Sequence, residues 1–332
     1  MPFTPFLAMH IPDGFITVPV ALVGWLVMLV LVGIALHQTR EQLGERQIPL
    51  MGILAAFVFA AQMINFPVAG GTSGHLLGGT LVAILLGPWA AVLVMTTVIA
   101  VQGFLFQDGG LLALGFNVFN MGVISAFVGY AVYTQIRKVL GNTPKGQLVG
   151  AATAAWLTVQ IAATATSLEL AVSGTSPLNV ALPAMLGVHV LIGLGEALIT
   201  VGALAFIRQA RPDLLDGSRP VEARGSTWIA IGLVIALAVA FASPLASSSP
   251  DGLERVAEDK AFMEKAQGAP YTLLPDYTIP GVDNKTLTTV TAGVIGVLVV
   301  AGVGYGVARM SGRGDITRPE EAAYHPGPAQ KP

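Results

Sequence analysis

Long apolar runs separated by short polar segments dominate this chain of 332 residues. A membrane-spanning helix needs about 20 mostly apolar residues, and runs near this length recur along the sequence. We therefore expect an all-α integral membrane protein, a polytopic bundle of about nine transmembrane helices. The runs predict helices at residues 17–36, 50–66, 76–87, 88–106, 111–134, 148–170, 183–207, 227–243 and 288–309.

The third of these segments, 76–87, is short for a span. Gly87-Pro88 is typical of a tight turn, so we expect it to join this segment to the next helix. Gly78-Gly79 predicts close packing between helix backbones. The predicted count of nine includes this short segment.

Composition supports a membrane protein and limits the chemistry. Only 11% of the residues are charged, whereas a soluble domain has about 25%. The net charge of −2 gives no basis for nucleic-acid binding. The sequence has no cysteine, which excludes disulfides and thiolate metal sites. Any metal ion must therefore be held by histidine, carboxylate or main-chain atoms.

The distribution of Lys and Arg predicts the orientation in the membrane. Of the 17 such residues, all but four follow the first, fifth, seventh or ninth predicted helix. The exceptions lie together near the loop 244–287: Arg255, Lys260, Lys265 and Lys285. We expect the N-terminus outside, the C-terminus in the cytoplasm, and the chain in the plasma (inner) membrane. Residues 9–16 and the loop 67–75 then share the outer side.

The chain divides at a polar segment rich in Pro, Gly and charge, 208–226, which predicts a cytoplasmic linker. Before it, residues 9–207 are expected to form one membrane domain. After it, residues 227–309 predict two helices around the acidic outer loop 244–287. The polar tail 310–332 is typical of a disordered cytoplasmic segment.

Residues 1–8, MPFTPFLA, lack the basic region and the long apolar core of a signal peptide. We expect this extension to be absent from the working protein, through a misassigned start codon or removal. Whether Met9 has a free α-amine depends on this expectation.

Met9-His10-Ile11-Pro12-Asp13-Gly14 precedes the first apolar run. In a chain that starts at Met9, the α-amine, the amide of His10 and its imidazole offer three nitrogens to one metal ion. An all-nitrogen planar set favours Ni(II) or Cu(II) over Zn(II) or Mg(II). Asp13, after a proline, is expected to cap or turn the chain into the first span; steering of cations is the alternative.

A second candidate is His75, in the glycine-rich segment Gly70-Gly71-Thr72-Ser73-Gly74-His75. Glycines let the backbone approach a ligand closely, since they have no side chain. The structural alternative is a histidine that caps a helix or bonds a loop carbonyl. Because two histidines are expected on the same outer side, we favour a shared metal site.

A third motif is Gln107-Asp108-Gly109-Gly110-Leu111-Leu112-Ala113-Leu114-Gly115. Together the three motifs resemble the substrate-binding membrane subunit of cobalt and nickel energy-coupling-factor transporters, the CbiM/NikM family. The resemblance covers residues 9 to about 207. The segment Pro250-Asp251-Gly252-Leu253-Glu254 resembles the PDGLE domain, which in this family accompanies a small accessory subunit.

The resemblance implies a metal site made by Met9, His10 and His75, with Ni²⁺ or Co²⁺ as the transported substrate and no bound organic cofactor. It implies that a transmembrane coupling subunit and ATP-binding cassette ATPases supply the energy. Nickel is slightly favoured, because amine and amide nitrogens in a plane suit it. The family starts at the methionine of the Met-His pair, and this chain departs from it by the extension.

Weaker candidates are polar residues that could orient a metal-bound imidazole. They are Asn65, Ser73, Gln107 and Asp108. Asn117 and Asn120, three apart on one predicted helix face, could do the same. The alternative is hydrogen bonding between helices, which is common in membrane bundles. We favour this alternative for Ser73, Asp108, Asn117 and Asn120, and we give both roles equal weight for Asn65 and Gln107.

His189 and Glu196 are seven residues apart and share one face of a predicted helix. Ionisable residues inside a span are often functional. They support the alternative function of a proton-coupled secondary metal transporter, although we favour a coupling or structural role. No phosphate-binding loop of the form GxxxxGK[ST] occurs, so we expect no ATPase site in this chain. A membrane enzyme ranks last.

Overall fold

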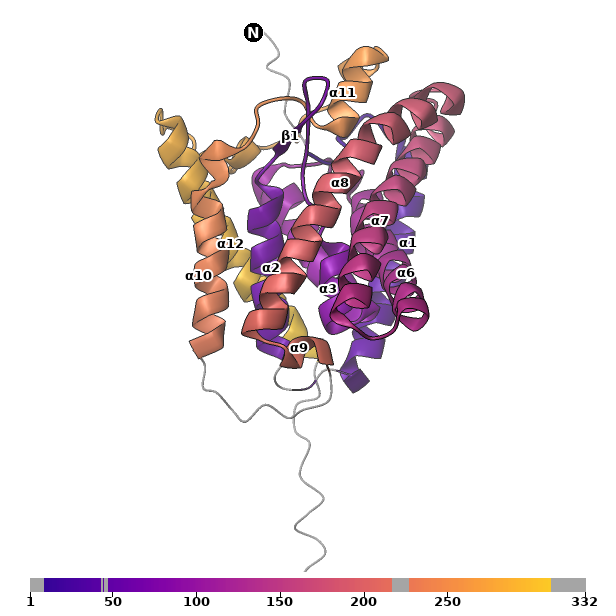
Figure 1. Ribbon diagram of the computed structural model, residues 1–332. Coiled ribbons are helices and arrows are strands. Elements are labelled where there is room, and N and C mark those ends of the chain that lie inside the picture. The colour runs from indigo at the N-terminus through magenta and orange to yellow at the C-terminus, as the bar shows by residue number, and fades with distance from the viewer. Residues whose placement is uncertain (1–8, 43, 45–46, 217–226, 312–332) are drawn as a thin grey trace, which may run out of the picture.

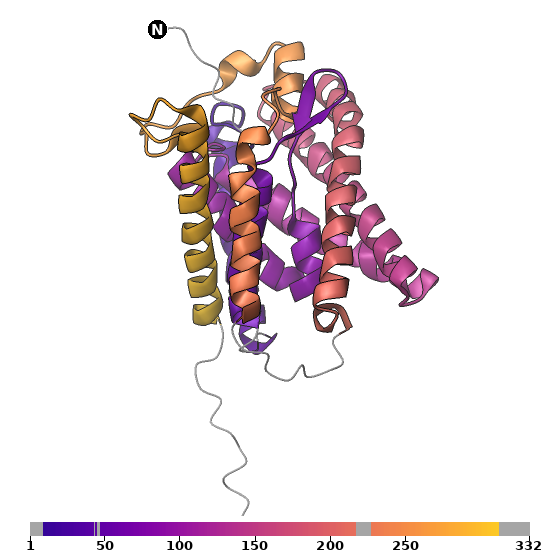
Figure 2. The same cartoon turned by 60° about the vertical axis from the view of Figure 1, so that its left-hand side comes forward.

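The longer helices are roughly aligned in a bundle. Loops and short elements cover one end of this bundle, and we call them the end layer (Figure 1). This computed structural model describes residues 9–42, 44, 47–216 and 227–311. The hairpin that begins with β1 and the short helix α11 both lie in the end layer (Figures 1 and 2). Helix α12 ends at the opposite end of the bundle (Figure 2).

The longer helices of the first part of the chain are α1 (Val18–Gln42), α2 (Gln47–Gln62), α4 (Pro88–Val101), α6 (Ser125–Leu140), α7 (Pro144–Val172) and α8 (Leu178–Ala210). Shorter elements are β1 (Phe66–Val68), β2 (Thr72–Gly74), α3 (Gly79–Leu86), η1 (Gln102–Phe106), α5 (Leu114–Val118), η2 (Phe119–Ile124) and α9 (Asp213–Asp216). The second part contains α10 (Thr227–Phe241), η3 (Ser243–Leu245), α11 (Gly252–Asp259), η4 (Met263–Lys265), η5 (Pro275–Tyr277) and α12 (Lys285–Ser311).

The all-α membrane architecture predicted from the apolar runs is confirmed. In the described part of the chain, 7 helical segments are long and apolar enough to cross a membrane. The predicted nine is not confirmed, because α2 has 16 residues and α3 has 8. At a rise of about 1.5 Å per residue, a helix as short as α3 cannot cross a hydrocarbon core of about 30 Å. The predicted membrane orientation of the termini stays a prediction.

The turn between α3 and α4 is the one that Gly87-Pro88 predicts. Gly87 has a φ of 84°, a left-handed conformation that glycine adopts without strain. Pro88 is the first residue of α4, where its missing N–H leaves no hydrogen bond unmade. The two helices therefore form one compact hairpin inside the bundle.

Lipid-facing and buried surfaces differ along the bundle. On α1, Leu22, Leu26 and Leu29 are each about 60% exposed, as expected for side chains that face lipid. At the contact between α1 and α5, a Cβ added to Gly115 would lie 2.3 Å from the carbonyl carbon of Gly24. Small residues at this contact let the two helix backbones approach.

The second part of the chain packs on the first at two levels. Within the bundle, α10 and α12 both pack against α2. In the end layer, Ser247 N donates to Asn65 O at 2.8 Å, and Gln267 N donates to Asp13 O at 2.8 Å. These contacts place the loop between α10 and α12 over the end of the bundle.

The predicted extremities and linker lie mostly outside the described residues. Residues 1–8, 217–226 and 312–332 are not described. In the part of 208–226 that is described, α8 continues to Ala210 and α9 follows at Asp213–Asp216. The linker expected from 208 therefore begins as helix.

Candidate functional site

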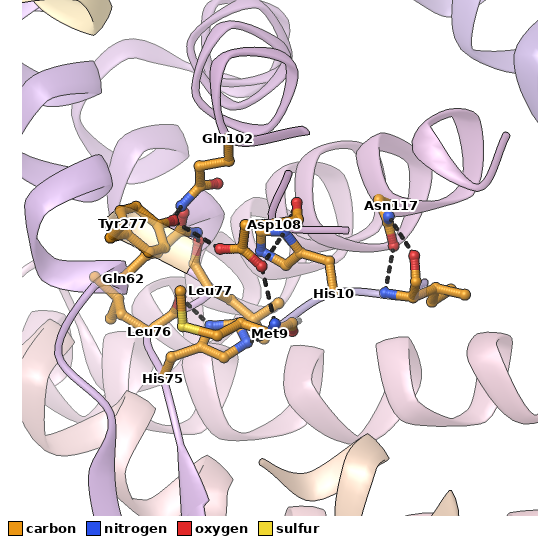
Figure 3. A network of polar contacts seen from close by, with 11 residues as sticks. Met9, His10, Gln62, His75, Leu76, Leu77, Gln102, Asp108, Asn117 and Tyr277 are labelled. Atoms are coloured by element: carbon orange, nitrogen blue, oxygen red, sulfur yellow. Dashed lines mark hydrogen bonds and ion pairs between the residues drawn. The ribbon is translucent and has the colours of Figure 1, made fainter. Parts of the chain in front are cut away.

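Met9 and His10 lie beside Asp108 of the loop 107–113 (Figure 3). Met9 N donates to Asp108 Oδ1 at 2.8 Å. His10 Nδ1 lies 3.1 Å from Asp108 O and 3.5 Å from Asp108 Oδ1. Two of the nitrogens proposed as metal ligands thus face one carboxylate.

His10 is buried, with 3% of its surface exposed. Its Nε2 has no hydrogen-bond partner among the described residues, an uncommon state for a buried polar atom. Burial lowers the pKa of His10, and the Asp108 carboxylate and the neighbouring His75 act on it in opposite directions. The imidazole is therefore neutral near pH 7, which is the form that binds metal.

Glycines give the N-terminal segment the space to lie on the 107–113 loop. A Cβ on Gly109, which has a φ of +92°, would lie 2.8 Å from His10 Cβ. A Cβ on Gly110 would lie 2.1 Å from Asp13 Oδ1. This explains the paired glycines of the third motif in physical terms: any side chain there would displace the segment that carries the candidate ligands.

Two polar side chains fix the same segment. Asn117 Oδ1 accepts from Ile11 N at 3.0 Å, and Asn117 Nδ2 donates to Ile11 O at 3.1 Å. The Asp13 carboxylate accepts from three successive main-chain N–H groups in the turn before α5, those of Leu111, Leu112 and Ala113, with distances of 2.8–3.2 Å. These bonds of Asp13 hold the N-terminal segment on the loop 107–113, and none of them is to the first span.

His75 lies next to the N-terminal pair. The rings of His10 and His75 are 5.5 Å apart between centroids, at an interplanar angle of 83°. His75 Nε2 lies 2.9 Å from Met9 O, and its Nδ1 lies 3.0 Å from Leu76 O. The structure therefore brings Met9, His10 and His75 together from segments 66 residues apart in the sequence.

A cavity of about 90 Å³ opens between these residues, α7, α8 and the start of α11. Its polar lining includes His10, His75, Asn117, Asn120, His189 and Asp251. Gly252 lines it too, and a Cβ there would lie 2.8 Å from His189 Cε1. The PDGLE-like turn is thus part of the cavity wall, and its glycine packs on His189.

The weaker sequence candidates divide into two groups. Asp108 is at the site itself. By contrast, the Ser73 hydroxyl donates to Ser249 O at 2.8 Å, and Gln107 Nε2 donates to Tyr271 O. The main-chain O of Asn65 accepts from Ser247 N, and its side-chain Oδ1 is buried without a hydrogen-bond partner in the part of the chain that the structure describes. These three residues hold the second part of the chain in place and do not contact His10 or His75 through any of these bonds.

His189 and Glu196 both lie on α8, but their side chains do different things. His189 lines the cavity, and its Nδ1 lies 2.7 Å from Met185 O. Glu196 is fully buried, and its two carboxylate oxygens accept from Leu77 N at 2.6 Å and Gly78 N at 3.0 Å. Glu196 thus holds the two residues that follow Leu76, close to His75.

Asn120 and Glu169 form a further buried pair beside the cavity. Asn120 Nδ2 donates to Glu169 Oε2 at 2.9 Å and to Thr166 Oγ1 at 3.2 Å. The bonds join η2 to α7, as expected for a polar side chain that ties helices together.

Sequence reasoning missed Tyr277, Gln102 and the contribution of Asp251. Tyr277 donates to Asp108 Oδ2 at 2.6 Å from a position 169 residues later in the chain. No local pattern marks this tyrosine, because its role depends on where the loop 244–287 folds back. Asp251 lies in the PDGLE-like motif, but the motif does not predict that this residue lines the cavity.

Side chains alone do not complete a metal site. Among the residues that the structure describes, no group of three or more His, Asp or Glu side chains could hold a metal ion. The prediction that the Met9 amine and the His10 amide add main-chain nitrogens to the imidazoles of His10 and His75 stays a prediction.

The fold and the cavity define a multi-pass membrane protein with a small polar site at one end of its helix bundle. The family described as "Cobalt uptake substrate-specific transmembrane region", CbiM, matches residues 10–214, and the PDGLE domain matches residues 226–313. The chain belongs to the CbiM family, with a PDGLE domain fused behind it.

One relative named here matches most of the chain, and two others match about two thirds of it. A protein of Archaeoglobus fulgidus that carries the name of a fused nickel transport protein, NikMN, is 36% identical and covers 91% of this chain and 98% of its own length. The cobalt transport protein CbiM of Sorangium cellulosum is 35% identical, over 63% of this chain and 95% of its own. A crystal structure of a transition metal transporter is 33% identical, with a TM-score of 0.56, over 65% of this chain and 100% of its own.

Proposed function

We propose that this protein is the substrate-capture and permease component of an energy-coupling-factor importer for a divalent transition metal. Nickel is the favoured ion and cobalt the second. The observation that carries the proposal is the convergence of Met9 N and His10 Nδ1 on one side of Asp108, with the His75 ring 5.5 Å from that of His10. The names of the relatives, which are nickel and cobalt transport proteins, support the same substrates.

The ligand set needs a chain that starts at Met9. A peptide nitrogen binds a metal only after it loses its proton, as the His10 amide must, whereas an α-amine needs no such step once it is neutral. In such a chain Asp108 Oδ1 can accept an amine hydrogen while the lone pair binds the metal. The buried Asp108 carboxylate also offsets the positive charge of the ion. His75, freed from Met9 O, supplies the remaining nitrogen.

The protein's own work is then binding without chemical turnover. Its residues strip water from the ion, exchange oxygen ligands for nitrogen ligands, and hold the ion in the cavity. Partner ATPases and a transmembrane coupling subunit supply the energy. The other candidate function is a proton-coupled carrier that uses Glu196 and His189. The two candidate functions give Glu196 different roles.

The test is a titration of the purified protein with Ni²⁺, with Co²⁺ as the competitor. Two forms are compared, one that begins at Met1 and one that begins at Met9. We expect one-to-one tight binding by the Met9 form and at least about 100-fold weaker binding by the Met1 form, since a direct ligand is worth more than the outer partners whose loss costs about 10–100-fold.

Absence of binding by folded protein of both forms would overturn the proposed site. The energy source is tested separately, by uptake in cells that carry the transport system. Uptake that stops on ATP depletion and resists a protonophore supports the importer. Uptake that survives ATP depletion and is abolished by a protonophore supports the proton-coupled carrier.

A further inference from the structure

A buried hydrogen-bonded chain connects the fused C-terminal part of the protein to the Met9 nitrogen (Figure 3). Gln102 Nε2 donates to the Tyr277 hydroxyl at 3.2 Å, and that hydroxyl donates to Asp108 Oδ2 at 2.6 Å. The other oxygen of the same carboxylate, Oδ1, accepts from Met9 N at 2.8 Å. The Asp108 carboxylate therefore links the Tyr277 hydroxyl to the Met9 nitrogen, which is a proposed metal ligand.

The Tyr277 ring has little freedom to move. It stacks on Phe106, with centroids 4.8 Å apart and an interplanar angle of 18°, and its centroid lies 6.0 Å from that of Phe59. The residue is 6% exposed. Packing on both aromatic rings fixes where the hydroxyl points, and the hydroxyl in turn fixes the plane of the Asp108 carboxylate.

The backbone is strained at both ends of this contact. Asp276 and Tyr277 have φ values of 49° and 54°, and Gln107, next to Asp108, has 59°. Left-handed conformations are uncommon for residues other than glycine and persist where the surrounding structure enforces them. The positions lie at or next to the two residues whose side chains meet in the 2.6 Å bond.

The hydrogen bond from Tyr277 to Asp108 is short, as strong hydrogen bonds are. Its length lies in the range of O–H donors to carboxylates, about 2.5–2.7 Å, which are roughly twice as strong as neutral pairs. Burial and the Asp108 charge raise the pKa of Tyr277 well above its usual value. The hydroxyl therefore keeps the proton that it donates.

We propose that Tyr277 is a positioning residue for the metal site. Its hydroxyl orients Asp108 so that Oδ1 holds the Met9 nitrogen beside His10 Nδ1. The inference rests on the proposed metal-binding function and deepens it, because it gives the fused C-terminal part a specific task at the site. Tyr277 itself binds no metal.

The experiment replaces Tyr277 by Phe in the full chain and in the form that begins at Met9. Loss of an outer partner of a metal site lowers affinity by about 10–100-fold, and we expect about 10-fold weaker Ni²⁺ binding. We also expect a shift of the visible absorption bands of bound Ni²⁺, because the geometry of its nitrogen ligands changes.

The matched control is Tyr271→Phe. The Tyr271 hydroxyl also ties the loop 244–287 to the first part of the chain, donating to Phe104 O at 2.9 Å, but it does not contact Asp108. This variant should keep the parent affinity and the parent spectrum. A purely structural role for the loop would make the two variants alike.

A second measurement tests whether Tyr277 acts through Asp108. In an Asp108→Ala background, Tyr277→Phe should cause no further loss of affinity, because residues in one network are not additive. Additive losses, or a Tyr277→Phe variant that binds like Tyr271→Phe, overturn the inference. Failure of the parent itself to bind Ni²⁺ would instead overturn the proposed function.

Discussion

The end cavity and the interior of α8 both bury ionisable side chains, but they use them differently. Glu196, 0% exposed, has both oxygens bonded to main-chain N–H groups. His10, 3% exposed, has an Nε2 without a hydrogen-bond partner among the described residues. The Glu196 carboxylate is satisfied by the backbone and is part of the fold, whereas the His10 imidazole keeps a hydrogen-bonding capacity that the described residues do not use.

The comparison favours the cavity as the site of metal capture and gives Glu196 a structural task. It predicts that substitutions in the two regions separate binding from stability. Substitution of a proposed ligand should abolish metal binding with little effect on the unliganded fold. Substitution of Glu196 should lower the stability of the fold and affect metal binding less.

The largest effect is expected from His10→Ala and His75→Ala. Each removes a proposed direct ligand, and each should weaken Ni²⁺ binding by more than about 100-fold, the upper end for loss of an outer partner. Isothermal titration of the form that begins at Met9 measures this, and thermal unfolding without metal should change little.

The control is His189→Ala, because His189 lines the same cavity from α8. We expect its affinity to stay within a few-fold of the parent. If His189→Ala costs as much as His75→Ala, His189 is a ligand and the contrast between the two regions fails.

The second effect concerns Glu196→Gln. Glutamine keeps one acceptor but turns its NH₂ group toward one of the N–H groups of Leu77 and Gly78. A buried donor left unsatisfied costs about 1–3 kcal/mol. We expect a loss of this size in the free energy of unfolding, measured in detergent, and a smaller loss of Ni²⁺ affinity than His75→Ala causes.

Thr200→Val is the matched control on the same helix, since the buried Thr200 hydroxyl finds no hydrogen-bond partner among the residues that the structure describes. It should not destabilise the protein comparably. Uptake per folded Glu196→Gln molecule at saturating nickel decides between the functions. Retained uptake supports a structural Glu196, and abolished uptake with intact binding supports the proton-coupled carrier.

Much of the fold could be predicted from the apolar runs, because lipid requires helices long enough to cross it. The last helix, expected at 288–309, spans Lys285–Ser311. The helix expected at 183–207 begins earlier, at Leu178, because Pro183 sits inside it and does not start it. The hairpin of β1 and β2 was not predicted, since three-residue strands beside glycines carry no periodic pattern.

The candidate site was predictable where a motif is local and hidden where it depends on tertiary packing. Met9, His10 and His75 stood out by residue type and by their neighbours. Asn117, expected to join helices, instead holds the backbone of Ile11. Tyr277 could not be found, because its position follows from how the C-terminal loop packs over the bundle.

The last prediction concerns the pH dependence of stability and Glu254, a buried carboxylate of the end layer that sharpens the comparison. Its Oε2 accepts from Asp251 N at 3.0 Å, but its Oε1 has no hydrogen-bond partner among the described residues. Glu196, with two N–H partners, is better satisfied. Burial first, and then the Asp251 charge, raise the pKa of Glu254 to about 9; the Asp108 and Asp276 carboxylates act in the same direction.

The sign of the pH dependence follows from this raised pKa. An unfolded glutamate titrates near about 4.3, so between that pH and about 9 the folded protein keeps a proton on Glu254 that the unfolded chain loses. The stabilisation is full below the unfolded pKa and is lost as pH rises through the folded one.

Glu254→Gln, which has no proton to lose and can still accept from Asp251 N, should show a smaller decline in thermal stability from pH 5 to pH 9. Asp259→Asn, at a half-exposed carboxylate on the same short helix, should keep the parent profile. A Glu254→Gln profile as steep as the parent's would show that Glu254 is charged in the folded protein, and the end layer would then tolerate a buried charge with one N–H partner.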